Sequence, residues 1–210
     1  MLHGARPARL ENGRRDLTDI AIDCFARYGY AATSIDRIAK AAGLTKGAIY
    51  YHFKDKEDLL FAAVRDRVGQ FEQSVTETLI PVADPVQALE QLTRICIDHA
   101  TKSNHRRFIV TLMVEALDTN ARLSAHFRKM MDRFRAFLCG IIEVGQKNGI
   151  FRTDVRAITA AGVYAGAVMG AEIQYYQDPK GFDLQQTLAA FQQSYIAWLS
   201  GPPARQPRRK

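Results

Sequence analysis

The densest group of side chains able to do chemistry lies between Thr45 and Lys56. It combines hydroxyl, ammonium, phenol and imidazole groups on Thr45, Lys46, Tyr50, Tyr51, His52 and Lys56. Such groups bond phosphate oxygens and base edges, and the small residues Gly47 and Ala48 allow close approach. Catalysis is a poor match, because the chain shows no nucleophile elbow, phosphate-binding glycine loop or metal-ligand spacing. The pattern favours contact with a nucleic acid.

The same residues also have ordinary structural interpretations. Phe53 fits best as a core aromatic, Tyr50 fits a core or a surface position equally well, and the lysines could form a solvated face. The net charge of +7 decides little. Four of the cations lie in the last ten residues, which we expect to be a disordered basic tail over 201–210.

Local spacing predicts the elements that position these side chains. Two short helices are expected at about 35–42 and 46–53, and Gly43 supplies the left-handed turn between them. Ala39 is small enough to be crossed by the second helix, and Thr33 and Asp36 have the spacing of a capping box. Apolar contacts between the helices are expected from Ile38, Leu44, Ile49 and Phe53.

Residues 29–39 and 42–60 resemble the DNA-binding domain of the tetracycline-repressor (TetR) family, over about a quarter of the chain. The resemblance implies a recognition helix that begins near Thr45 and enters the major groove. It also implies phosphate contacts around that helix. The DNA-contacting set implied by the resemblance is Thr33, Ser34, Thr45, Lys46, Gly47, Ala48, Tyr50, Tyr51, His52 and Lys56.

The rest of the chain also predicts helices. A long one starts after Asp55, and others are expected at about 86–102, 105–118, 121–147, 155–176 and 184–199. The expected fold is all-α with about nine helices. We expect a three-helix DNA-binding domain over 1–60, joined through the long helix to a ligand-binding and dimerisation domain over 61–200.

The TetR resemblance implies a ligand pocket in the larger domain and a homodimer formed by the last two helices. Our predicted pocket residues are Phe108, Leu112, Met131, Phe134 and Tyr164. Gly162, Gly166 and Gly170 recur every four residues and predict a close packing seam. The sequence leaves open whether that seam packs within one subunit or between two.

The predicted function is therefore that of a dimeric transcriptional regulator and not of an enzyme. It is expected to repress from a near-palindromic operator until a small apolar or aromatic molecule binds; activation is the alternative. No cofactor or metal is expected. The apolar stretch from Ala157 to Ala171 is too short to span a membrane, and no secretory signal is visible, so a cytoplasmic protein is expected.

Overall fold

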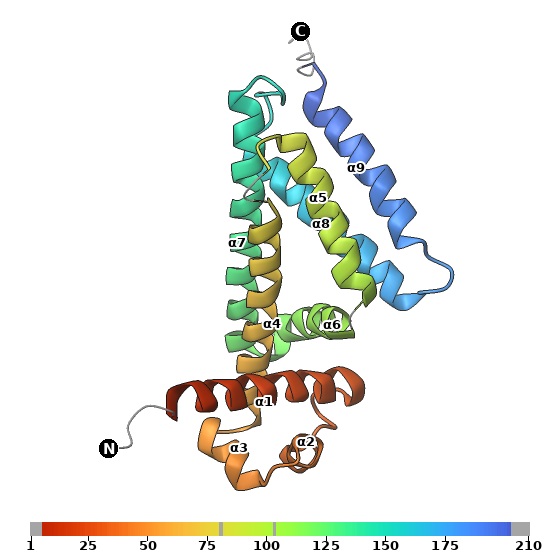
Figure 1. Ribbon diagram of the computed structural model, residues 1–210. Coiled ribbons are helices and arrows are strands. Elements are labelled where there is room, and N and C mark those ends of the chain that lie inside the picture. Colours follow the sequence, from red (N-terminus) through yellow and green to blue (C-terminus); the bar gives the residue numbers. More distant parts are fainter. Residues whose placement is uncertain (1–5, 80–81, 103, 203–210) are drawn as a thin grey trace. The chain divides into compact units, whose positions relative to one another are not determined.

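A computed structural model describes residues 6–79, 82–102 and 104–202. Within these ranges the chain forms nine helices and no strand, which confirms the all-α prediction. The helices, drawn in Figure 1, are α1 (Arg6–Tyr28), α2 (Ile35–Ala42), α3 (Lys46–His52), α4 (Lys56–Leu79), α5 (Pro85–Lys102), α6 (Asn104–Thr119), α7 (Ala121–Lys147), α8 (Ala157–Gln177) and α9 (Leu184–Ser200). No described helix, α8 included, has the length and apolar character that a bilayer span requires. Most of the predicted tail, residues 203–210, lies outside the described residues.

Residue contacts divide the described chain into two compact units. The first contains residues 6–73 and 104–123, and the second contains residues 74–79, 82–102 and 124–202. We expected a boundary at residue 60. The first unit extends further because α6 packs against α1, and α4 passes from the first unit into the second.

The helix-turn-helix of the first unit forms where the sequence predicts it. Ser34 and Thr45 precede α2 and α3, and the hydroxyl oxygen of each accepts a hydrogen bond of 3.2 Å from the amide three residues later, at Arg37 and Ala48. Gly43 ends α2 with a φ of 64°, a conformation that glycine adopts without a Cβ clash. Local hydrogen bonds thus fix both ends of the turn.

Thr33 does not cap α2, so the predicted Thr33–Asp36 capping box is wrong. The Thr33 side chain is buried, and its hydroxyl donates to the carbonyl oxygen of Gly29 at 2.7 Å and lies 3.3 Å from that of Cys24. Thr33 therefore fixes the end of α1 and the loop that follows it, and the cap falls to Ser34.

Three of the four predicted apolar contacts of the helix-turn-helix are buried. Ile38, Ile49 and Phe53 have at most 1% of their surface exposed, and Ala39 is also buried beside them. Leu44 is 45% exposed, so its predicted place between the helices is wrong. Gly43 turns the chain before Leu44 and leaves that side chain outside the core.

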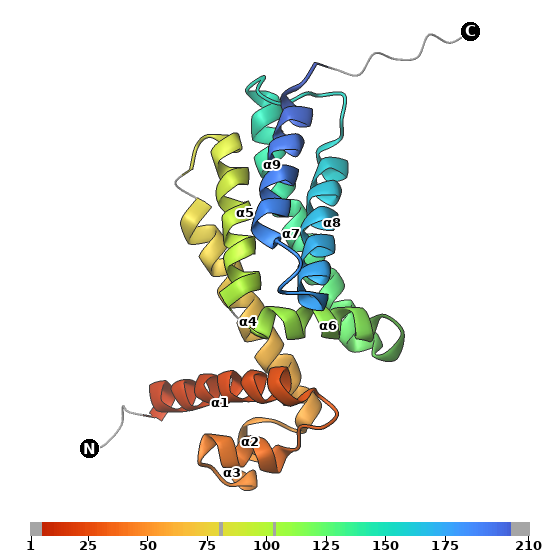
Figure 2. The same cartoon turned by 90° about the vertical axis from the view of Figure 1, so that its right-hand side faces the viewer.

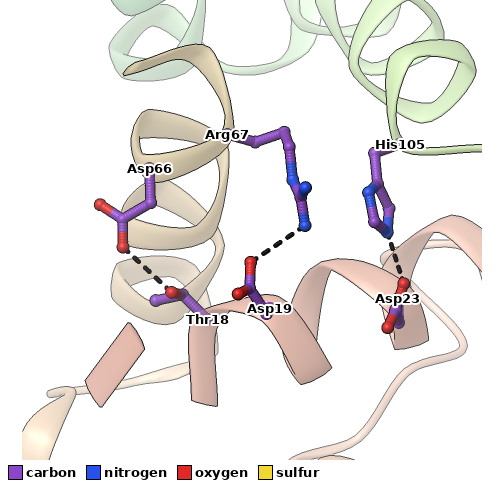
Figure 3. A network of polar contacts seen from close by, with 6 residues as sticks. All are labelled: Thr18, Asp19, Asp23, Asp66, Arg67 and His105. Carbon is purple, nitrogen blue, oxygen red and sulfur yellow. Dashed lines mark hydrogen bonds and ion pairs between the residues drawn. The ribbon is translucent and has the colours of Figure 1, made fainter. Parts of the chain in front are cut away.

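Polar contacts tie α1 to α4 and α6 within the first unit, as Figure 3 shows. The Thr18 hydroxyl donates to Asp66 at 3.0 Å, and the Arg67 guanidinium donates to Asp19 at 2.9 Å. A short contact joins His105 of α6 to Asp23. The Phe108 ring of α6 also stacks on Phe25 of α1, with 6.2 Å between ring centroids. These contacts link three helices into one packed group.

In the second unit α5, α8 and α9 lie side by side, as Figure 2 shows. Their contact region is aromatic: Tyr164, Phe191 and Tyr195 lie with ring centroids 5.3–5.6 Å apart. The Tyr164 hydroxyl bonds Thr93 at 2.8 Å, and the Tyr195 hydroxyl donates to a backbone carbonyl of α8 at 2.8 Å. Trp198 packs on Tyr195 at 5.7 Å. Burial raises the pKa of both Tyr164 and Tyr195.

Candidate nucleic-acid interface

Helix α3 and the N-cap residues of α2 and α3 include most of the predicted DNA-contacting residues. Ser34, Thr45, Lys46 and Gly47 are exposed, and Ala48 and His52 are half-buried. Tyr50 is 53% exposed and Tyr51 is 76% exposed. Tyr50 is thus a surface residue, which settles the choice that the sequence left open, while Phe53 lies in the core as expected. The structure brings these side chains together around α3.

Two members of the predicted set face inward. The hydroxyl of Thr33 is already bonded inside the protein, as described above. The Lys56 ammonium donates to the carbonyl oxygen of Tyr30 at 3.0 Å and lies 4.3 Å from the centroid of its ring. Burial, helped by the carboxylates of Glu57 and Asp55, raises the pKa of the Tyr30 phenol. In this conformation Lys56 braces the start of α4 against the loop after α1.

An ion pair crosses the exposed face. The Lys46 ammonium lies 2.7 Å from a carboxylate oxygen of Asp36, with side chains 56% and 64% exposed. The pair joins the first turn of α2 to the first turn of α3. Sequence reasoning assigned Asp36 only to a helix cap. The signal that could have identified Asp36 is its place as an acid in the first turn of α2, two residues after Ser34 of the predicted DNA-contacting set.

Two arginines outside the predicted set also pack against aromatic rings near this face. The Arg37 guanidinium lies 4.3 Å from the ring centroid of Tyr28, and that of Arg14 lies 5.2 Å from the centroid of Phe53. Such cation–π contacts favour these positions of the two guanidinium groups by about 0.5–1 kcal/mol at exposed sites.

The five predicted ligand-contacting residues fall in both units. Phe108 and Leu112 belong to α6 in the first unit, and Met131, Phe134 and Tyr164 belong to the second. Phe108 is half-buried against Phe25 and also borders an open hollow of about 1140 Å³ between α1, α2 and α6. Leu112 and Tyr164 are buried, whereas Met131 and Phe134 are half-buried.

Comparison with known proteins identifies the family to which the chain belongs. Residues 17–63 match the family model described as bacterial regulatory proteins of the tetR family, and residues 85–168 match a tetracyclin repressor-like C-terminal domain. The chain is 32% identical over 150 residues to the HTH-type transcriptional repressor KstR2 of Rhodococcus jostii, covering 69% of this chain and 71% of the relative. The chain belongs to the TetR family.

Other TetR relatives match over nearly the whole length. The repressor NicS of Pseudomonas putida is 29% identical over 202 residues, covering 94% of this chain and 92% of NicS. FadR of Bacillus subtilis in complex with stearoyl-CoA has a TM-score of 0.77 at 20% identity, covering 88% of this chain and 98% of FadR. A putative regulator of Saccharomonospora viridis in complex with choline has a TM-score of 0.76 at 24% identity, covering 89% and 96%. The two structures show a common fold.

Membership of the TetR family makes this chain a helix-turn-helix transcription regulator and not an enzyme. The residues that the family model covers at the N-terminus include the whole exposed face of α2 and α3.

Proposed function

We propose that this chain is a cytoplasmic homodimeric repressor. It binds a near-palindromic operator and leaves it when a small apolar or aromatic molecule binds the C-terminal domain. One observation supports DNA binding: the polar groups of Ser34, Lys46 and Tyr51 are exposed on a helix pair whose isoleucine side chains are buried. Such a surface offers hydrogen-bond donors for phosphates and base edges. The repressor assignment is supported by KstR2 and NicS, which are both named as repressors.

The surface of α8 and α9 supports a homodimer through these helices. Helix α9 contains no charged residue, and the single charged residue of α8, Glu172, is fully buried. The outward side of α8 instead exposes Ile158 at 45% and Val163 at 47%. Depletion of charge over an exposed apolar surface is typical of an interface core. A second copy of the chain would cover it.

The glycine seam supports the same assignment. A Cβ atom added to Gly162, Gly166 or Gly170 would meet no described atom within 4 Å. No other described helix of the same subunit therefore packs closely against these glycines. Their lack of side chains would allow the α8 helices of two subunits to approach closely. Two subunits would then present their recognition helices about 34–36 Å apart, one DNA turn.

We place the proposed effector site in the second unit, with Met131, Phe134 and Tyr164 as its contacts. The prediction for Phe108 and Leu112, which belong to the first unit, stays a prediction. Met131 and Phe134 are half-buried, so part of each side chain is accessible to a ligand. Methionine and phenylalanine adapt well to apolar ligands. FadR, with bound stearoyl-CoA, supports an apolar ligand, while the choline-bound regulator makes a small cation the alternative to be tested.

Helix α4 provides the proposed route from effector to DNA. Its residues 56–73 belong to the first unit and 74–79 to the second, without a break in the helix. The bonds from Thr18 to Asp66 and from Arg67 to Asp19 would make α1 follow any tilt of α4. An effector can cause such a tilt only if it binds the two conformations with different affinity.

The first experiment tests DNA binding and assembly together. The full chain is used to select duplexes from a randomised pool, and the mass of each selected complex is measured. We expect an inverted repeat with half-site centres one turn apart, bound by two chains. Selection of no sequence, or binding by a single chain to a single half-site, contradicts the proposal.

The second experiment tests effector sensing. Acyl-CoAs, aromatic acids and choline are screened for a rise in the melting temperature, and each hit is then titrated into the operator complex. We expect an apolar or aromatic compound to raise the melting temperature and to release the DNA. A choline response alone would replace the proposed ligand class. A hit that leaves operator binding unchanged would contradict ligand-controlled repression.

A further inference from the structure

The Asp36–Lys46 pair is the starting point, because it places an acid on the surface that approaches DNA. Lys46 begins α3 and Asp36 lies in the first turn of α2, so their 2.7 Å contact spans the two helices of the motif. Both side chains are more than half exposed. An exposed ion pair contributes little to folding stability, since water screens the charges. The helix dipole favours a carboxylate in the first turn of α2, but that interaction does not require the contact with Lys46.

The pair is also a poor partner for a phosphate. A carboxylate 2.7 Å from the Lys46 ammonium cancels most of its charge at the distance of a phosphate, and the carboxylate itself repels phosphate oxygens. A lysine that served only to neutralise the DNA backbone would bind better without this acid. The Lys46 ammonium is a hydrogen-bond donor and the Asp36 carboxylate beside it is an acceptor. Together they match a DNA surface on which an acceptor lies next to a donor.

A G·C base pair presents that arrangement in the major groove. Guanine offers the acceptors N7 and O6, and cytosine offers the N4 amino donor. O6 and N4 are hydrogen-bonded to each other, about 2.9 Å apart, close to the spacing of the Lys46 and Asp36 atoms. Lysine donates to guanine O6 and N7, and aspartate accepts from cytosine N4. A reversed C·G pair would set the carboxylate against O6, and a T·A pair would place the thymine methyl where N7 is needed.

We propose that Asp36 and Lys46 together recognise one G·C base pair in each half-site of the operator, and that Asp36 is a specificity-determining residue. The inference rests on the proposed DNA binding and goes beyond it, because it assigns a base preference to a residue outside the expected contact set. Asp36 accepts from the cytosine amino group and also holds the Lys46 ammonium over the guanine.

The test compares the native chain with Asp36→Asn, Asp36→Glu, Lys46→Gln and the Asp36→Asn/Lys46→Gln double variant. Each is used to select duplexes from a randomised pool, and affinities for the selected duplex and for unrelated DNA are measured at several salt concentrations. Asp98→Asn is the matched control, since Asp98 and Lys102 of α5 form an exposed ion pair of 2.8 Å outside the first unit.

We expect the native chain to select one G·C pair strongly in each half-site. Asp36→Asn and Lys46→Gln should each lower that preference about tenfold to a hundredfold. The double variant should lose little more than either single variant, because the two side chains act on one base pair. Asp36→Asn should also strengthen binding to unrelated DNA and steepen its salt dependence by about one charge, since it frees the ammonium for phosphates. Asp36→Glu, which keeps the carboxylate, should retain the preference.

The same data can overturn the inference without touching the proposed function. If the native chain selects an inverted repeat and Asp36→Asn selects the same sequence with the same preferences, Asp36 takes no part in base recognition. If Asp36→Asn weakens every position equally and lowers the melting temperature more than Asp98→Asn does, Asp36 has only a structural role. If the native chain selects no sequence at all, the proposed function itself fails.

Discussion

The chain exposes two surfaces of opposite chemistry. The surface of α2 and α3 is made mainly of hydroxyls, phenols and an ion pair; the isoleucines of both helices lie inside, and Leu44 of the turn is exposed. The surface of α8 and α9 exposes isoleucine, valine, glycine and alanine side by side with uncharged polar residues, and its only charged residue lies inside. Polar side chains keep their hydrogen bonds to water on the first surface, whereas a contiguous apolar surface such as the second is typical of an interaction site. The difference fits the two proposed partners: a second subunit that covers the α8 and α9 surface permanently, and an operator that the α2 and α3 surface binds and releases.

The largest expected effect comes from placing a charge on the uncharged surface. Val163→Asp should convert the dimer into a folded monomer, because a carboxylate would be buried in the interface without a partner. Operator affinity should then fall about a hundredfold or more, since two linked half-site contacts become independent. Sedimentation gives the assembly state and a DNA titration gives the affinity.

Val144→Asp is the matched control for that variant. Val144 of α7 is 46% exposed, against 47% for Val163, and lies in the same unit. It should leave both the dimer and operator affinity unchanged. A Val163→Asp protein that remains dimeric would remove the distinction drawn between the two surfaces.

A smaller effect is expected at the polar surface. Tyr51→Phe removes one exposed hydroxyl and should weaken operator binding about tenfold, the value of a hydrogen bond to a charged group. The free energy of unfolding and the dimer should stay unchanged, because the Tyr51 ring is 76% exposed. Tyr28→Phe, at a phenol 45% exposed outside the predicted contact set, is the control. Equal losses in both variants would mean that the hydroxyl of Tyr51 has no special role.

Thr33→Val tests whether Thr33 belongs to the DNA-contacting surface. The buried hydroxyl of Thr33 bonds the end of α1, so its loss should lower the free energy of unfolding by about 1 kcal/mol while leaving operator affinity unchanged. Thr111→Val, at an exposed threonine of α6, should cost less than about 0.5 kcal/mol. If the Thr33→Val protein is fully folded and still binds the operator more weakly, Thr33 contacts phosphate as the family resemblance implies.

The smallest expected effect is a loss of folding stability at alkaline pH, caused by the buried tyrosines of α8 and α9. Burial raises the pKa of Tyr164 and Tyr195 above the ordinary value of 10.0. Well below pH 10 both phenols are neutral in the folded and the unfolded chain, so their burial costs no stability. As the pH rises further the unfolded chain ionises first, and the free energy of unfolding falls. Denaturant titrations at several pH values measure this decline, which Tyr195→Phe should make shallower. A decline that stays equally steep in that variant would place its cause elsewhere.

The local features of the fold could be predicted from the sequence. Helix ends marked by Gly43 and by the Asp84–Pro85 pair depend on neighbouring residues only, and they fall where expected. Features that depend on packing between helices could not be predicted in the same way. The choice of Ser34 over Thr33 as the cap depends on the burial of Thr33 against α1, and the exposure of Leu44 depends on how the chain leaves the turn.

The candidate site divides along the same line. The exposed residues from Thr45 to Tyr51 follow from the pattern of α3 itself. The Asp36–Lys46 pair links residues ten positions apart through the crossing of two helices, and the Lys56–Tyr30 contact joins residues 26 apart. Neither has a repeating pattern in the sequence. The glycine seam shows the same limit: the spacing predicts a close-packing surface, but it does not tell that no described atom of the chain would meet a Cβ atom added there.

The position of Trp198 has a practical consequence. It is the only tryptophan in the chain, and its ring lies against Tyr195 in α9. Its emission therefore arises from the C-terminal unit alone, whatever happens at the recognition helix. Excitation of the neighbouring tyrosines feeds the same ring by energy transfer. The protein thus carries a built-in optical probe, and an unlabelled sample can report a change around α9 in real time as candidate effectors are added.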